Sequence, residues 1–240
     1  MRRFARLSVF SINLPSWLPA EAAQSRRRRR GRNTVTKAAS QPEGFRLLPG
    51  YFSRPAQEEL LENLRMVLVD APLFRPVMPR TGKPFSVRMS NCGPLGWVSD
   101  IHGYRYQPAH PATGNPWPAM PDMLVKLWQD VAPDAPEPEA CLINFYETSA
   151  KMGLHQDRDE ETFDTPVVSV SLGDTATFRI GGTNRKDPTT SLRLSSGDVA
   201  VLGGPSRLAF HGIDRILPGT STLLKNGGRI NLTLRRVTKA

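Results

Sequence analysis

The feature that most constrains the fold is the series of short β-type segments in the second half of the chain. After Glu139 the sequence holds at least six short runs rich in Val, Ile, Leu and Thr, separated by Gly, Asp, Asn and Pro. They fall within residues 141–147, 166–173, 176–182, 191–204 and 229–237. Such spacing is typical of an antiparallel sandwich, barrel or jelly roll.

Two helical segments precede these strands. In residues 56–70, apolar side chains recur at spacings of three and four, which predicts one buried helical face. They are Leu60, Leu61, Leu64, Val67 and Leu68. A second helix is predicted at about residues 122–131, and we expect both helices to cover one outer face of the sheet. Residues 71–119, rich in Pro, Gly and aromatic residues, are expected to form short strands and the long loops of a lid.

The formal net charge of +10 is concentrated at the start of the chain. Residues 1–44 hold ten basic side chains and two acidic ones, so they carry +8 of that charge. The body is nearly balanced, which argues against reading the total charge as a DNA-binding surface. We predict a basic, disordered extension over residues 1–42 and one domain over residues 43–240, with a jelly-roll core at about 139–237. A targeting peptide, or a start codon placed too far upstream, is the alternative for the extension.

The cysteine content and the hydropathy of the sequence argue against several classes of protein. Cys92 and Cys141 lack the CxxC spacing of a zinc knuckle and are too few for a disulfide-dense secreted scaffold. No run approaches the roughly 20 apolar residues that span a bilayer. We therefore expect a soluble, cytoplasmic monomer without membrane contact.

Two of the four histidines stand where a metal site could form. His155 and Asp157 make an HxD pair, and residues two apart on an extended segment point to the same side. His211, at the end of a strand-rich segment, could supply a third ligand. Two imidazoles and one carboxylate are how non-haem Fe(II) oxygenases leave room for a bidentate co-substrate and O₂. Taken alone, HxD is a weak signal and His211 fits a helix-capping or core-edge histidine.

The last predicted strand separates its side chains into two faces. In residues 229–235 the polar residues are all odd-numbered and the apolar ones all even-numbered. An edge strand with a solvated face would give this pattern, and so would a jelly-roll strand whose polar face points between two sheets. Arginine pairs bidentately with carboxylates, and 2-oxoglutarate has one at each end. Because six residues of strand span about 20 Å, we assign Arg229 to the distal carboxylate and Arg235 to the metal-bound end.

Residues 141–146 alternate in the same way, with Asn144 and Tyr146 on one face. Their amide and phenol groups could complete the hydrogen bonds of the co-substrate. Ordinary buried groups with satisfied hydrogen bonds are the alternative.

Taken together, these motifs resemble the AlkB family of bacterial alkylation-repair dioxygenases. The resemblance rests on NCGPLGW (91–97), GYRY (103–106), NPWPAMP (115–121), ACLINFYETSAKMGLHQDRDE (140–160), PVVSVSLG, FRIGG, NRKDP (184–188), GDVAVLGGPSRLAFHGI and RINLTLR. It runs from about Phe45 to Arg236. The HxD pair, the distal histidine and the RxNxTxR strand occur in the family's order.

The resemblance implies a role for each candidate residue. The family's iron ligands fall on His155, Asp157 and His211. Its 2-oxoglutarate contacts fall on Asn144, Tyr146, Arg229, Asn231 and Arg235, with Thr233 on the same strand face. Its substrate pocket falls on Met89, Trp97, Tyr104, Tyr106, Asp159 and Arg185. Trp97 would stack on a flipped base and Asp159 would favour a cationic one, although Trp97 could also be a core aromatic residue.

The fold that the resemblance implies is mainly β with flanking helices (α+β), a double-stranded β-helix or jelly roll with an N-terminal nucleotide-recognition lid. The implied reaction is oxidative demethylation of bases such as 1-methyladenine and 3-methylcytosine in alkylated DNA, with RNA as a further candidate substrate. It consumes Fe(II)-activated O₂ and 2-oxoglutarate and releases formaldehyde, succinate and CO₂. The alternatives are a dioxygenase of the same fold acting on tRNA or protein, and a non-catalytic nucleic-acid-binding module.

Overall fold

The computed structural model describes residues 42–239, so the predicted basic extension lies outside the described residues. In chain order the elements are β1 (Phe45–Leu48), α1 (Arg54–Asp70), β2 (Arg88–Cys92), β3 (Gly96–Asp100), β4 (Gly103–Gln107), α2 (Asp122–Val131), β5 (Ala140–Tyr146), β6 (Met152–His155), β7 (Val167–Gly173), β8 (Thr175–Ile180), β9 (Thr190–Leu194), β10 (Val199–Leu202), a 3-10 turn (Gly204–Ser206), β11 (His211–Leu217) and β12 (Arg229–Arg235).

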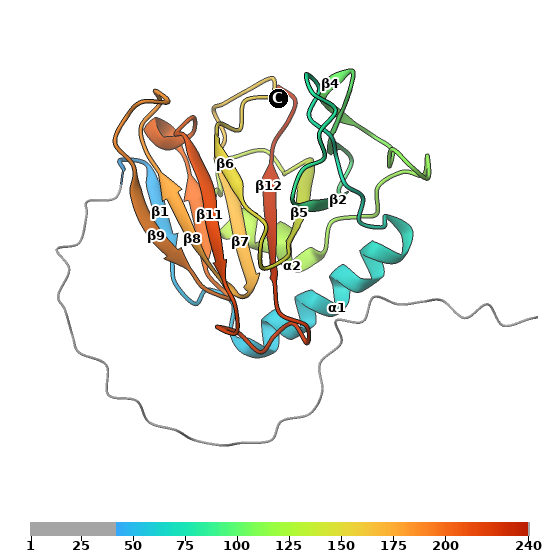
Figure 1. The fold of residues 1–240 in the computed structure, drawn as a ribbon, viewed down its shortest axis with the longest axis horizontal. Helices are drawn as coiled ribbons and strands as arrows, with labels where there is room; N and C mark the ends of the chain where they lie inside the picture. Colours follow the sequence, from blue (N-terminus) through green and yellow to red (C-terminus); the bar gives the residue numbers. More distant parts are fainter. Residues whose placement is uncertain (1–41, 240) are drawn as a thin grey trace, which may run out of the picture.

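Two antiparallel sheets form the body of the domain (Figure 1). The larger sheet has the strand order β1-β10-β7-β12-β5-β2, and the smaller has the order β6-β11-β8-β9. Side chains of both sheets share one apolar cluster, including Leu142 and Val167 from the larger and Phe178 and Ile213 from the smaller. The predicted jelly roll is therefore confirmed. Strands β3 and β4 pair only with each other and form a separate hairpin.

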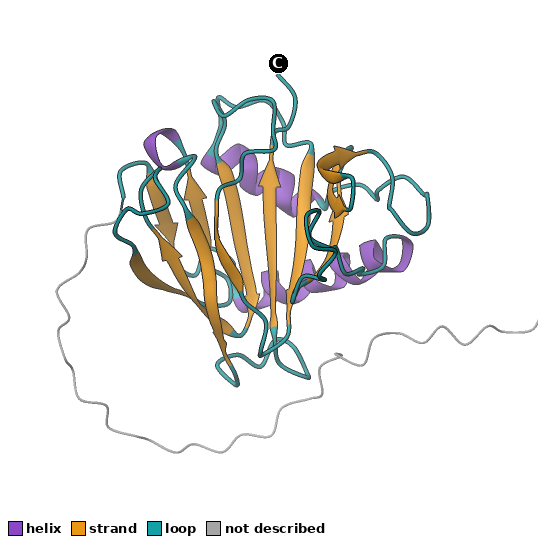
Figure 2. Ribbon diagram, turned by 45° about the horizontal axis from the view of Figure 1, so that its top comes forward, coloured by secondary structure: helices purple, strands orange, loops and turns teal. Residues whose placement is uncertain are grey.

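Both helices cover the outer face of the larger sheet (Figure 2). The Ser53 side chain accepts a hydrogen bond from the backbone N–H of Ala56 and caps α1, and a proline in the first turn is tolerated there because its missing N–H has no helical partner. The apolar side of α1 and α2 packs in one cluster with strand residues such as Leu232 and Leu234. This confirms the predicted position of the helices. Neither helix in residues 42–239 has the length and apolarity needed to cross a membrane.

Strand β12 lies in the middle of the larger sheet, between β5 and β7. Its even-numbered side chains, Ile230, Leu232 and Leu234, pack in the cluster beneath the helices. Its odd-numbered polar side chains are buried as well and line the space between the two sheets. The prediction of an edge strand with a solvated polar face is therefore wrong. The alternative, a jelly-roll strand whose polar face points between the two sheets, is confirmed.

Two local expectations need correction. His211 does not end a strand-rich segment: it begins β11, a strand that the sequence reading did not identify. Its polar residues, Asp214 and Arg215, are adjacent in the sequence, and a register shift between Ile213 and Arg215 breaks the simple alternation. In addition, Met89 within the predicted lid lies on β2, which is hydrogen-bonded to β5 in the larger sheet.

The two cysteines, far apart in the sequence, face each other across β2 and β5. Both are free and buried. A hydrogen bond with Cys141, together with burial, raises the pKa of the Cys92 thiol well above its usual value. Neither thiol lines the space between the sheets, so both belong to the packing beneath the helices.

Truncation of the buried face of α1 tests this packing. Leu60 is fully buried, so Leu60→Ala should lower the free energy of unfolding by about 2–5 kcal/mol through lost burial and the cavity left behind. Met66 on the same helix is 69% exposed, and Met66→Ala should change it by less than about 0.5 kcal/mol. Urea denaturation of both variants provides the measurement, and equal effects would contradict the assigned helix orientation.

Candidate active site

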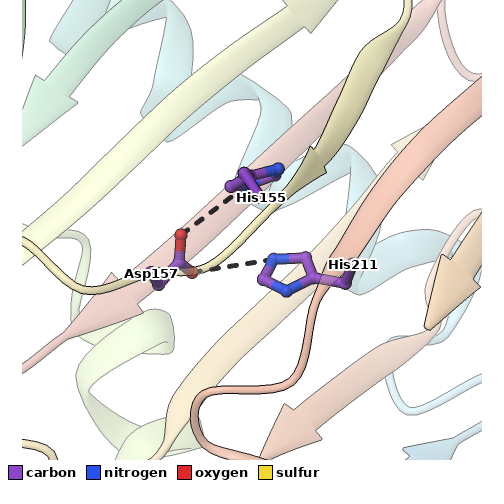
Figure 3. Close-up of side chains that lie close together, drawn as sticks. All are labelled: His155, Asp157 and His211. Carbon is purple, nitrogen blue, oxygen red and sulfur yellow. Dashed lines mark ion pairs between the residues drawn. The ribbon is translucent and has the colours of Figure 1, made fainter. Parts of the chain in front are cut away.

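Three side chains with metal-ligating atoms meet at one end of the space between the sheets (Figure 3). His155 ends β6, Asp157 follows two residues later, and His211 begins β11. One ligand atom from each lies within 4.8 Å of the others. The Nε2 atoms of His155 and His211 are 3.7 Å and 3.8 Å from the two oxygens of Asp157.

Backbone pairing explains how the two histidines come together. His155 and His211 are direct partners in the antiparallel pair of β6 and β11, so their side chains lie on the same face. Gly212 allows the close approach, because a Cβ at this position would lie 2.6 Å from the backbone oxygen of Met152. The imidazole centroids are 4.5 Å apart.

Hydrogen bonds to the backbone fix which nitrogen of each imidazole faces the site. The Nδ1 atom of His155 lies 2.9 Å from the carbonyl oxygen of Gly153, and that of His211 lies 2.9 Å from the carbonyl oxygen of Ala209. A carbonyl oxygen can only accept, so each Nδ1 carries the proton and donates it. The Nε2 lone pairs then point towards Asp157 and are available to a metal.

The charges of the three groups also suit a divalent cation. Burial alone would raise the pKa of Asp157, but Arg235, His211 and His155 outweigh it and hold that pKa well below the usual range. The closest cationic atom is Nη2 of Arg235, 3.0 Å from Oδ2. Burial, followed by the neighbouring His155, lowers the pKa of His211 to about 4. At neutral pH the site therefore presents a carboxylate and an unprotonated His211 imidazole, as Fe(II) requires.

A cavity of about 510 Å³ extends from these residues between the two sheets. The polar face of β12 forms one wall, and the polar face of β5 continues it. Every residue predicted to contact 2-oxoglutarate lines this cavity, namely Asn144, Tyr146, Arg229, Asn231, Thr233 and Arg235. The structure thus brings the two alternating strands to one surface.

Arg229 marks the end of the cavity away from Asp157. Its side chain is buried, its Nη2 donates to Ser171 Oγ at 2.9 Å, and its guanidinium lies 5.3 Å from the ring of Tyr146. Among residues 42–239 its Nε and Nη1 atoms have no hydrogen-bond partner. Burial lowers the pKa of Arg229 to about 10, which still leaves it a cation at neutral pH. Unpaired buried donors on a cation fit the distal carboxylate of a diacid.

Between the two arginines, the wall is already organised by hydrogen bonds. Asn231 Nδ2 donates to Ser169 Oγ at 2.7 Å and to the Val170 carbonyl at 2.9 Å, while Thr233 Oγ1 donates to Asn231 Oδ1 at 3.1 Å. Asn144 Oδ1 is buried without a partner among the described residues. Thr233 and Asn231 hold each other in place, and of the Asn144 amide only the Nδ2 group could donate to a carboxylate.

The other side of the cavity carries the aromatic candidates. Trp97 on β3 stacks on Tyr104 of β4 with ring centroids 5.5 Å apart, and its Nε1 donates to Asp159 Oδ2 at 2.8 Å. Tyr106 donates its hydroxyl to Glu160 at 2.6 Å. Met89, Trp97, Tyr104, Tyr106 and Asp159 all line the cavity. Arg185 does not: its Nη1 donates to the Leu154 carbonyl at 2.8 Å, and it lies over Phe210, which does line the cavity.

Two charged residues of this region had no role in the sequence reading. Glu160 and Arg207 form an ion pair at 3.3 Å, with side chains 1% and 3% exposed. Glu160 ends the run DRDE, a pattern that usually marks a solvated face, and Arg207 stands in a loop, so neither residue gives a local signal of burial. The two residues are 47 positions apart in the sequence, and only the fold brings them into contact.

The chain is similar to known proteins along most of its length. Residues 44–235 match the model of the 2OG-Fe(II) oxygenase superfamily. The alpha-ketoglutarate-dependent dioxygenase AlkB homolog of Caulobacter vibrioides (strain NA1000 / CB15N) is 54% identical over 211 residues, which are 88% of this chain and 96% of the relative. The chain is an AlkB-type member of this superfamily.

Further relatives agree with the AlkB assignment. The alpha-ketoglutarate-dependent dioxygenase AlkB of Escherichia coli (strain K12) is 45% identical over 193 residues, covering 78% of this chain and 88% of that protein. The solved structure of OsALKBH1 aligns with a TM-score of 0.69 at 32% identity, over 82% of this chain and all of that one. As a member of this family the protein is a dioxygenase that uses Fe(II) and 2-oxoglutarate, in keeping with its His-Asp-His cluster.

Removal of the shared carboxylate tests the metal assignment. Asp157→Asn should weaken Fe(II) or Mn(II) binding by at least about 100-fold, since even the loss of a residue that only orients a metal ligand costs about 10–100-fold. Asp134→Asn changes an exposed carboxylate outside the cavity and should leave metal affinity unaltered. Anaerobic metal titration followed by calorimetry distinguishes the two, and an Asp157→Asn variant that binds metal normally would overturn the assignment.

Arg229→Met tests the distal carboxylate site separately. It should weaken 2-oxoglutarate binding by about 30-fold or more, the change that corresponds to about 2 kcal/mol for a buried charge-assisted contact. Metal affinity should be preserved, because Arg229 lies at the opposite end of β12 from Arg235. Arg193→Met on β9, where the side chain is exposed, is the matched control. Loss of metal and co-substrate affinity together would argue for a folding defect.

Proposed function

We propose that this dioxygenase removes N-linked alkyl groups from nucleobases by oxidation, with alkylated DNA as the main substrate and RNA as a secondary one. The observation that carries the proposal is the position of Asp159. Its carboxylate is held beside the Trp97 ring by the 2.8 Å hydrogen bond, two residues beyond the candidate iron ligand Asp157. An aromatic face and an adjacent anion favour a flat, cationic ring such as 1-methyladenine or 3-methylcytosine.

Each group of residues has a distinct task in this proposal. His155, Asp157 and His211 hold the iron, and Arg229, Asn144 and Tyr146 bind the co-substrate end that faces away from it. Arg235 neutralises the metal end. Trp97, with Tyr104 stacked behind it, supports the base, and Met89 closes the apolar wall. Arg185, which lies outside the cavity lining, is proposed to contact the nucleic acid backbone near the opening.

Iron held by His155, Asp157 and His211 would, with 2-oxoglutarate and O₂, supply an oxidant able to insert one oxygen atom into a C–H bond of the N-alkyl group. The second oxygen atom enters succinate as 2-oxoglutarate loses CO₂. The resulting N–CH₂OH group breaks at its C–N bond, which returns the proton to the base nitrogen and releases formaldehyde. The protein residues need only orient the alkyl carbon and exclude water, so none of them acts as a nucleophile.

The names of the AlkB relatives support the reaction class, and the cavity supports the substrate class. The volume of about 510 Å³ extends beyond the co-substrate wall to the aromatic side and suits one extruded base next to a small diacid. We further propose that one copy of the chain is sufficient, because the candidate ligands and pocket residues all come from a single chain.

The test is a single-turnover assay. The protein is loaded anaerobically with Fe(II) and 2-oxoglutarate, then mixed in air with a single-stranded DNA containing 1-methyladenine. We expect one formaldehyde and one succinate for each methyl group lost, with no formaldehyde from the unmethylated strand. A methylated RNA of the same sequence serves as the second arm.

The other outcomes separate the alternatives. Succinate without demethylation of either strand would retain the dioxygenase and exclude these nucleobases as substrates. Demethylation of RNA alone would contradict the assignment of DNA as the main substrate.

A further inference from the structure

Glu160 is a buried carboxylate on which three parts of the protein converge. Its Oε1 accepts a hydrogen bond from the Tyr106 hydroxyl at 2.6 Å and lies 3.2 Å from Nε of Arg235. Its Oε2 accepts from Nη2 of Arg207 at 3.3 Å. Tyr106 belongs to the base side of the cavity, Arg235 to the co-substrate wall, and Arg207 to the turn that leads to His211.

The contacts continue from Glu160 to the candidate iron ligand. Arg235 forms the 3.0 Å ion pair with Asp157, and Arg207 donates its Nη1 to the backbone carbonyl of Asp157 at 2.7 Å. Arg207 also donates to the Thr165 carbonyl at 2.9 Å. The side chain and the backbone of Asp157 are thus held by two arginines, and both arginines contact Glu160.

The charges of this cluster balance only when Glu160 is present. Two guanidinium groups, Arg207 and Arg235, face two carboxylates, Asp157 and Glu160, and all four side chains are 7% exposed or less. A buried charge is tolerated when it is paired, and loses that compensation when one partner is removed. Without Glu160, Arg207 would lose its carboxylate partner, and Arg235 would pair with Asp157 alone, the residue that has to bind metal.

The link to the base side runs through the β3–β4 hairpin. This hairpin is not part of either large sheet, and Trp97 and Tyr106 are direct partners across it. Two side-chain hydrogen bonds join it to consecutive residues of the loop that follows Asp157: Trp97 donates to Asp159, and Tyr106 donates to Glu160. A base that stacks on Trp97 therefore contacts the same hairpin that positions Tyr106 to donate to Glu160.

We propose that Glu160 is a positioning residue that couples the base pocket to the 2-oxoglutarate site. It holds Tyr106 and Arg235 in one arrangement, so that occupation of either site favours the arrangement required by the other. The inference rests on the proposed function, since it takes the two ligands to be an alkylated base and 2-oxoglutarate. Coupling of this kind is reciprocal: each ligand raises the affinity for the other by the same factor.

The experiment measures that factor without turnover. The full chain is loaded with Mn(II) in place of iron under nitrogen, and the Kd of 2-oxoglutarate is determined by calorimetry with and without a saturating 1-methyladenine oligonucleotide. In the unchanged protein the oligonucleotide should tighten 2-oxoglutarate binding by about fivefold or more. In Glu160→Gln the ratio of the two Kd values should fall to within about twofold of one.

A double-mutant cycle distinguishes coupling from general destabilisation. Tyr106→Phe removes one hydroxyl group from the hairpin and should abolish the coupling as Glu160→Gln does, and the double variant should show no further change. Tyr106→Phe also keeps the test decisive if Glu160→Gln fails to fold. Glu139→Gln is the matched control: this carboxylate pairs with Arg236 at 3.4 Å outside the cavity, and its loss should leave the factor intact.

The failures are distinguishable. An unchanged protein that binds no 2-oxoglutarate would overturn the proposed function, and this inference with it. Binding of both ligands without coupling in the unchanged protein, or with full coupling in Glu160→Gln, would overturn only the role of Glu160.

Discussion

The buried ion pair between Arg235 and Asp157 is the contact on which the site depends. Arg235 ends the central strand of the larger sheet, and Asp157 follows the first strand of the smaller one. The pair therefore joins the two sheets where the metal ligands meet. Removing both charges from water is costly, and the additional contacts of Glu160 and Arg207 offset that cost. The same pairing keeps Asp157 ionised, which a metal ligand has to be.

The two ends of the cavity differ in how their charges are satisfied. At the metal end, cations and carboxylates of the protein are matched. At the other end, no ion pair joins Arg229 to a carboxylate within residues 42–239, and its Nη2 donates to the neutral Ser171 hydroxyl. For a dianion placed between the two ends, the electrostatic stabilisation would be largest when the carboxylate that does not bind the metal lies at Arg229. Under the proposed function, the polarity of the wall would orient 2-oxoglutarate before the metal contributes.

The alternation of polar and apolar side chains allowed part of this architecture to be predicted from the sequence. In residues 229–235 every second side chain is polar, and in residues 141–146 the polar Asn144 and Tyr146 share one face; both strands place these residues on the cavity wall. Strand β11 was missed because its register shift breaks the alternation. Glu160 and Arg207 were missed for another reason: their roles depend on contacts between residues 47 positions apart, and their local sequence resembles solvated loops. The periodicity of a sequence predicts which face of an element is buried. It does not predict which charged residues from distant segments form a buried ion pair.

The unpaired donors of Arg229 have a consequence for the energetics of the whole fold. These donors gain a partner when the co-substrate binds, and a ligand that binds only the folded chain shifts the folding equilibrium towards the folded state. A co-substrate bound at Arg229 would then also stabilise the fold. In a cell, the small unfolded fraction of the protein would fall as the supply of 2-oxoglutarate rises, so that loss of the enzyme through its unfolded form would slow when its co-substrate is abundant.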